Sequence, residues 1–149
     1  MSISSRFSVG IHLLSLLDID KDQPEINTSE FLAGSVNTNP AVVRKIMGML
    51  RNAGLVKTRP GKAGAELAKD LSEVTLLDVY KAVEAVKENQ LFSIHDDPNP
   101  KCIVGRNIQH SIGEHFNEAQ QALERSLEKT TVDQVVRQIE KDEASEERH

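Results

Sequence analysis

The chain has 149 residues, of which 38% are hydrophobic and 28% charged, which is the composition of one folded domain and not of a disordered segment. It contains no apolar run long enough to cross a membrane and no recognisable secretory leader, and its single cysteine excludes an internal disulfide framework, so we expect a cytoplasmic protein without a membrane partner. The net charge of −5 is shared unevenly, because residues 1–69 hold nine Lys and Arg against six Asp and Glu, whereas residues 70–149 hold nine against seventeen.

Two helices are predicted at the beginning of the chain. Apolar residues at helical spacing indicate a first helix from about Ile3 to Leu17, followed by a charged loop that Pro24 closes. A short second helix is expected to begin at Thr28 or Ser29, because either hydroxyl is a good N-cap.

A third helix and a hairpin follow a polar turn. The dipeptide Asn39-Pro40 predicts a helix start, since Asn caps and Pro tolerates the first helical position, and Gly54 predicts its end just after Asn52. Residues 55–59 have the character of a short strand, and residues 65–69 can return as a second strand after a glycine turn. Helix, turn, helix and hairpin is the order of a winged helix-turn-helix.

The second half is predicted to be helical around one irregular loop. Thr75 is expected to open a fourth helix with Val86 on its buried side, and the prolines of residues 92–102 exclude a helix there. Residues 103–127 form a long helix with an apolar stripe at Val104, Ile108, Ile112, Phe116, Ala119, Leu123 and Leu127. A last helix spans residues 130–141, capped by Thr130 or Thr131.

Positive charge is concentrated between residues 39 and 64. Six Lys and Arg lie in this window and no Asp or Glu opposes them, which favours a surface that contacts phosphates. Arg44 is the best candidate for a guanine edge, because its guanidinium matches O6 and N7. The residues predicted to contact double-stranded DNA are Thr38, Asn39, Pro40, Arg44, Lys45, Arg59 and Lys62.

The chain resembles the Rrf2 family of bacterial transcriptional regulators. The resemblance rests on SRFSVGIHLLSLL, SEFLAGSVNTNPAVVRKIMGMLRNAGLVKTRPGKAGAEL and TLLDVYKAVE, and the segment LFSIHDDPNPKCIVGRNIQHSI is similar to the YwnA-like branch of that family. The resemblance implies a dimeric winged-helix DNA-binding protein, usually a repressor, that pairs through the long helix at residues 103–127. The turn of residues 61–65 departs from the family pattern, because it lacks the aromatic residue that often ends the wing.

The loop before the long helix differs from that of well-studied family members, which hold an iron–sulfur cluster through three cysteines. This chain has only Cys102 there, so we predict no cofactor and no metal held in that way. A helix N-terminus and Lys101 beside it would favour a thiolate, which makes Cys102 a candidate redox or electrophile sensor; the alternative is a small buried hydrophobe. His12 is either a core histidine or, by the resemblance, a ligand.

The expected fold is mostly α with a small β-hairpin: a winged helix-turn-helix domain at 1–90, a loop at 91–102, dimerisation helices at 103–143 and a disordered tail at 144–149. The expected function is a repressor that binds a palindromic operator as a homodimer. A winged-helix module that binds another protein is the alternative. We expect no enzyme, because no nucleophile–base pair, phosphate loop or HExxH motif is found.

Overall fold

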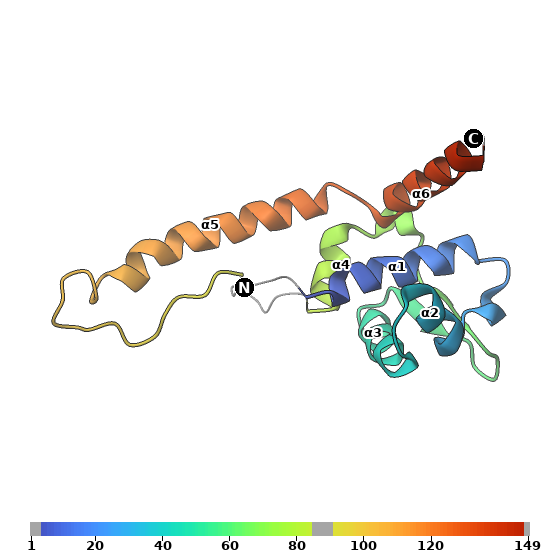
Figure 1. Cartoon of the computed structure of the whole chain (residues 1–149), viewed down its shortest axis with the longest axis horizontal. Coiled ribbons are helices and arrows are strands. Elements are labelled where there is room, and N and C mark those ends of the chain that lie inside the picture. Colours follow the sequence, from blue (N-terminus) through green and yellow to red (C-terminus); the bar gives the residue numbers. More distant parts are fainter. Residues whose placement is uncertain (1–3, 85–90, 148–149) are drawn as a thin grey trace.

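A computed structural model describes residues 4–84 and 91–147 and shows a globular head from which one long helix projects (Figure 1). The head contains α1 (Arg6–Ile19), η1 (Pro24–Ile26), α2 (Ser29–Val36), α3 (Pro40–Asn52), β1 (Val56–Thr58), β2 (Ala65–Leu67), η2 (Leu71–Glu73) and α4 (Leu76–Ala82). The projecting helix is α5 (Ile108–Glu128), and α6 (Val132–Glu147) returns the chain to the head beside α1. No helix of the described segments is long and apolar enough to span a bilayer.

The core of the head is aliphatic, as a chain without tryptophan requires. Leu13, Leu14 and Leu17 on one side of α1 are at most 1% exposed and belong to the same buried cluster as Ile46 and Leu50 of α3. Each such side chain contributes roughly 1.5–3 kcal/mol through its removal from water. This packing fixes α3 with its remaining faces outward.

Local capping signals place the helix ends of the head as the sequence predicts. The side chains of Thr28, Asn39 and Thr75 accept hydrogen bonds from backbone N–H groups in the first turns of α2, α3 and α4. Gly54 has φ +77 after α3, its N–H donates to the Arg51 carbonyl, and the N–H of Leu55 donates to the Leu50 carbonyl. These two bonds form a Schellman motif, which turns the chain directly into β1.

A short backbone joint connects the projecting helix to the head. Thr75 and Thr131 form an isolated antiparallel bridge, in which the N–H of Leu76 donates to the Thr130 carbonyl and the N–H of Val132 donates to the Val74 carbonyl, both at 2.8 Å. The starts of α4 and α6 are therefore held together where α5 ends.

α5 begins five residues later than expected, at Ile108 and not at residue 103. The preceding residues form turns, because the N–H of Cys102 donates to the Asn99 carbonyl and the backbones of Asn99 and Gly105 approach each other too closely for a Cβ. Upstream residues fold back along α5: the N–H of Leu91 donates to Oε1 of the buried Gln120, and two phenylalanine rings, of residues 92 and 116, stack at 5.0 Å.

The C-terminal helix is longer than expected. α6 continues to Glu147, whereas we expected its end near residue 141 and a disordered tail at 144–149. Only the hydrogen bond from Gln138 to Asp142, at 2.8 Å, reaches past the expected end; the pair of Arg137 with Asp133, also at 2.8 Å, lies within the expected helix. Val86, expected on the buried side of α4, lies outside the described residues, as do residues 148 and 149.

Candidate nucleic-acid interface

The second helix of the helix-turn-helix presents its predicted contact residues at its start and on its outer side. Oδ1 of Asn39 accepts the N–H of Val42 at 3.0 Å, so this side chain acts as the N-cap and is exposed on its other side. Thr38 and Pro40 beside it are half-buried. Arg44 lies one turn after Pro40 on α3 and is exposed, as is Lys45 beside it.

The wing is a two-stranded antiparallel hairpin in which Lys57 lies opposite Glu66. Nζ of Lys57 lies 3.6 Å from Oε1 of Glu66, so part of its charge is neutralised within the wing. Nη1 of Arg59 donates to the Ala63 carbonyl at 2.6 Å, which folds this predicted contact residue across the wing turn. Lys62 is exposed at the tip, where its backbone N–H donates to the Arg59 carbonyl at 2.9 Å.

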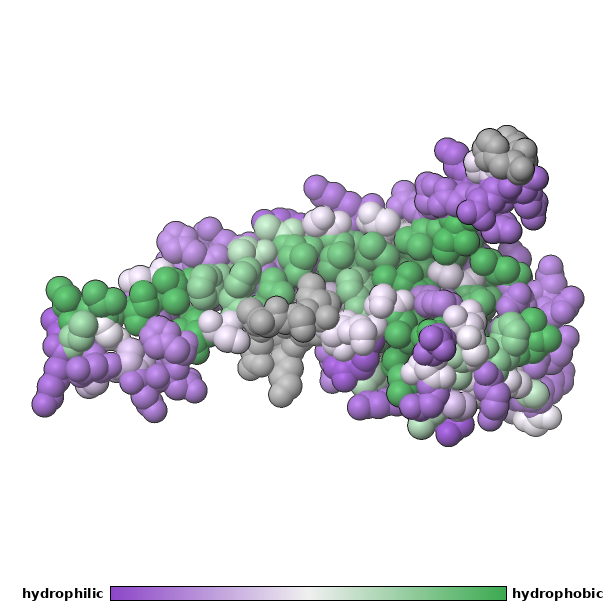
Figure 2. All heavy atoms as spheres, in the orientation of Figure 1, coloured by the Kyte–Doolittle hydropathy of each residue, from purple (hydrophilic) through white to green (hydrophobic). Residues whose placement is uncertain are grey.

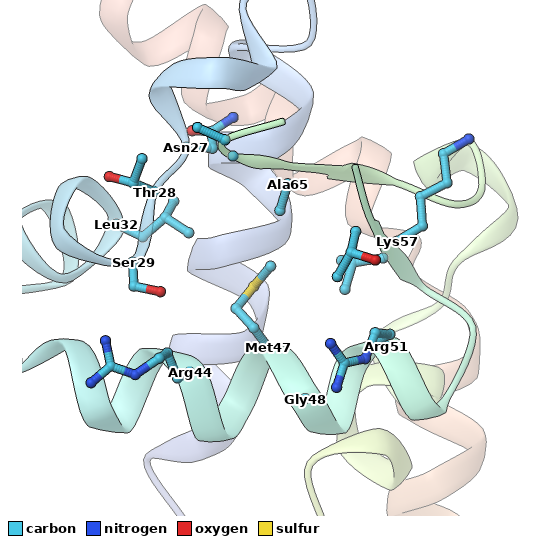
Figure 3. A pocket seen from close by; sticks show the side chains of 14 residues that line it. Asn27, Thr28, Ser29, Leu32, Arg44, Met47, Gly48, Arg51, Lys57 and Ala65 are labelled. Atoms are coloured by element: carbon cyan, nitrogen blue, oxygen red, sulfur yellow. The ribbon is translucent and has the colours of Figure 1, made fainter. Parts of the chain in front are cut away.

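A groove of about 500 Å³ lies between α3 and the wing and reaches the N-terminal end of α2 (Figure 3). Its lining combines apolar side chains with cationic and hydroxyl groups, among them Ser29, Leu32, Arg44, Met47, Arg51 and Lys57. We call this surface the α3–wing groove. Lys45, by contrast, is exposed on α3 without lining it.

Of the residues that line this groove, the sequence singled out only Arg44 as a DNA contact. Ser29 was predicted only as a possible cap, and Arg51 and Lys57 were counted in the basic window without being chosen as contact residues. Arg51 follows Arg44 by seven residues, which is two helical turns, so their shared face was readable from the sequence. The approach of α2 to the wing was not, because it depends on packing.

Comparison with known proteins decides the family. Residues 3–138 match the family Rrf2, described as iron-dependent transcriptional regulators. The chain belongs to the Rrf2 family. This confirms the resemblance found in the sequence, and it identifies the fold as the winged helix-turn-helix of DNA-binding transcriptional regulators.

Several relatives match along nearly their whole length. YwnA of Bacillus subtilis (strain 168), assigned as an HTH-type transcriptional regulator, is 42% identical over 137 residues, covering 92% of this chain and 98% of YwnA. A crystal structure of a protein assigned as DNA-binding has a TM-score of 0.70 at 40% identity, covering 88% of this chain and 98% of that one. The oxidised form of Staphylococcus aureus CymR shares the fold, with a TM-score of 0.64 at 22% identity, covering 91% and 96% of the two chains.

The residues of this Rrf2 chain do not fit the iron–sulfur cluster that the family implies. Such clusters are normally held by several cysteine thiolates, and the chain has one cysteine. In the segments 4–84 and 91–147, no three side chains of His, Cys, Asp or Glu gather where they could hold a metal ion.

The single thiol, Cys102, is exposed in the turns before α5. The backbone N–H groups of Gly105 and Val104 point to its sulfur and lower the pKa of the thiol. From the sequence we expected the N-terminus of the long helix to lower this pKa. α5 begins six residues after Cys102, so its N-terminus is not the cause. The alternative of a buried hydrophobe is wrong.

His12 is exposed on α1, and its Nε2 lies 2.9 Å from Oγ of Ser35 in a hydrogen bond. The interpretation as a core histidine is therefore wrong. The apolar residues of α1 surround the helix, so the sequence did not show that residue 12 faces outward.

Proposed function

We propose that this chain is a homodimeric transcriptional repressor that binds a palindromic operator through α3 and the wing. The observation that carries the proposal is the cationic α3–wing surface, on which Arg44, Lys45, Arg51 and Lys62 are exposed on a fold that belongs to DNA-binding regulators. A major groove about 12 Å wide admits one helix, and α3 has only small or flexible side chains on its outer side. Such a regulator acts on the chromosome, in the cytoplasm of a bacterium.

The dimer is supported by the exposure of α5. This helix has 21 residues, and its only buried residue is the polar Gln120. Figure 2 shows a continuous hydrophobic band along it. Leu123 and Leu127 pack against the head, but Ile103 and Val104, just before the helix, are 68% and 62% exposed. A second copy that pairs over residues 103–127 would cover this band, and a two-fold axis makes the contact closed.

A two-fold dimer predicts the form of the operator. Each copy offers one α3, so the two half-sites should be related by a palindrome and separated by about one helical turn of DNA, or a multiple of it. The exposed Val42 at the start of α3, together with Ala41, suits contact with thymine methyl groups.

One experiment tests the dimer and the operator together. The protein is sedimented to establish its mass, and bound DNA is then selected from a random pool under reducing and oxidising conditions. We expect a dimer and a palindromic consensus. A single subunit in sedimentation, or the absence of any enriched sequence, would refute the proposal.

We also propose that the protein works without an iron–sulfur cluster and responds to oxidants through Cys102. The thiolate form of the exposed Cys102 would attack hydrogen peroxide, breaking the O–O bond to give a sulfenate and water. A dithiol would then reduce the sulfenate to the thiolate, releasing water and forming its own disulfide. The DNA affinity of the wild type should change after peroxide and recover with dithiothreitol, whereas Cys102→Ser should not respond. An identical response of both proteins would refute this role.

The alternative is a winged-helix module that binds another protein. Val42 on α3 is 37% exposed and Phe31 on α2 is 44% exposed, which is the kind of apolar surface a protein partner uses. Titration with mixed genomic fragments separates the two functions, because binding to phosphates weakens steeply as salt is raised. Absence of binding in dilute buffer would favour the protein partner.

A further inference from the structure

The α3–wing groove has a cationic rim above an apolar floor. Arg44 and Arg51 stand on α3 on either side of Met47, whose side chain points toward Ala65, and Leu32 lies across the groove from α3 (Figure 3). A ligand that suits this lining carries negative charges and also has an apolar surface of its own.

The two arginines are available for a ligand. Among the residues that the structure describes, neither Arg44 nor Arg51 forms a salt bridge, whereas Lys57 on the opposite wall is already paired with Glu66. A guanidinium carries five N–H donors in a fixed plane, and phosphate oxygens match that arrangement. The unpaired charge of the groove is thus on its α3 side.

At the end of the groove nearest α2, the buried side chain of Asn27 also lacks hydrogen-bond partners among the described residues. The side chain of Asn27 is 2% exposed, and neither its amide nitrogen nor its amide oxygen has a partner within the described part of the chain. Ser29 follows at the first helical position, where backbone N–H groups have no intrahelical acceptor, and its hydroxyl faces the groove (Figure 3). A phosphate oxygen here, or a water that it orders, would satisfy these donors.

We propose that the α3–wing groove holds one sugar–phosphate strand of the DNA duplex, with Arg44 and Arg51 on its phosphates, its sugars over Met47, and a further phosphate at Ser29. The proposal deepens the proposed function and rests on it. Seven residues separate the arginines by about 10 Å along the helix. Phosphates of one strand follow each other every 3.4 Å or so along the duplex axis. The arginines therefore contact different phosphates.

This placement changes the role expected for Arg44. A side chain that lines the groove beside Arg51 contacts the backbone, and base edges are left to the start and the other flank of α3, where Ala41, Val42 and Lys45 are exposed without lining the groove. Phosphate contacts set the register of the protein on DNA, while base contacts select the sequence.

The test compares binding of the full-length protein to a mixed-sequence 30-bp duplex and to a selected operator between about 50 and 200 mM KCl. Arg44→Ala and Arg51→Ala should each weaken binding to both duplexes by the same factor, and each should reduce the slope of log K against log[salt] by about 0.9. Lys81→Ala is the control, because Lys81 is exposed on α4, outside both the groove and residues 103–127, and should leave the slope unchanged.

Lysine variants separate a phosphate contact from a base contact. Arg44→Lys and Arg51→Lys keep the charge, so they should keep nearly the wild-type slope and the wild-type preference for the operator. A loss confined to the operator, with an unchanged slope in the alanine variants, would overturn the groove assignment and leave DNA binding intact. A wild-type protein that binds neither duplex would instead overturn the proposed function. Inorganic phosphate should weaken DNA binding no more than KCl does at the same ionic strength. A larger effect would show that the groove is a site for a free anion, and would overturn the proposal that it holds a DNA strand.

Discussion

The wing is held against η1 at Gly64, and a single methyl group there should detach it. Gly64 has φ +88, and a Cβ would overlap the Pro24 carbonyl oxygen and lie 2.9 Å from Cα of Glu25. Gly61, in the same turn, has φ +69 but open space around the position of a Cβ. An alanine at either position adopts a strained left-handed conformation, but only the alanine at residue 64 collides with another segment. Comparing the two variants therefore separates the cost of backbone strain from the cost of the collision.

The two costs can be estimated separately. A left-handed conformation costs a residue other than glycine about 1–2 kcal/mol, which applies to both variants. The collision at Gly64 involves backbone atoms that no rotamer change can move, and forced shifts of this kind typically cost a further ~1–3 kcal/mol. Gly64→Ala should therefore be less stable than Gly61→Ala by about 1–3 kcal/mol, unless the wing leaves η1 and limits the loss.

Urea unfolding of both variants measures the stability difference, and hydrogen exchange of the Lys57 and Glu66 amides reports whether the wing has opened. Opening of the wing would remove one wall of the α3–wing groove, so the DNA affinity of Gly64→Ala should fall as well. Equal unfolding midpoints, equal exchange rates and equal DNA affinity in the two variants would refute the reasoning.

Three further changes test other parts of the molecule. Asn27→Leu replaces a buried amide without partners, so thermal unfolding should show equal stability or a gain of up to about 1 kcal/mol while DNA binding weakens; a clear loss of stability would contradict this. Burial raises the pKa of Asp18, partly offset by Lys21 and reinforced by Asp133, so its folded value lies above the unfolded one and the charged form opposes folding at pH 7. Asp18→Asn should gain roughly 0.2–1 kcal/mol at pH 7 and lose this gain as the pH falls below about 4; the same gain at pH 3 would argue against the charge. Thr75→Ala removes the capping box of α4 and should cost about 0.5–2 kcal/mol in urea unfolding, whereas Thr75→Ser should not; equal stability of the two would exclude the cap as the cause.

The parts of the fold that follow from neighbouring residues were predictable from the sequence. Asn39 and Thr75 cap helices with bonds to N–H groups three residues away, and Gly54 ends α3 with bonds to its last turn. Such bonds depend only on residues close in the sequence, so the bounds of the helix-turn-helix and its hairpin could be predicted to within a few residues. The start of α5 was placed too early, because the apolar spacing of residues 103–107 continues that of the helix while their backbone forms turns, in which the N–H of Cys102 donates to the Asn99 carbonyl and Gly105 lies against the backbone of Asn99.

The candidate site was predictable as a charged helix but not as a groove. Arg44 and Lys45 stand out in a window without acids, whereas Ser29 and Asn27 line the groove only because η1 packs beside β2 and α2 packs on α3. Arg59 shows the opposite case, since its sequence position on the wing suggested a free cation and its guanidinium instead bonds to the wing turn. Long-range packing thus decides the position of Ser29 and Asn27, and a local hydrogen bond decides the orientation of Arg59.

The joint at Thr75 and Thr131 has a mechanical consequence. It sets the direction in which α5 leaves the head, and α5, with its 21 residues, is about 31 Å long. A tilt of about 5° at the joint displaces the far end of a rod of that length by roughly 3 Å, close to the rise of one base pair. In the proposed dimer, strain at these two hydrogen bonds would therefore alter the distance between the two copies of α3.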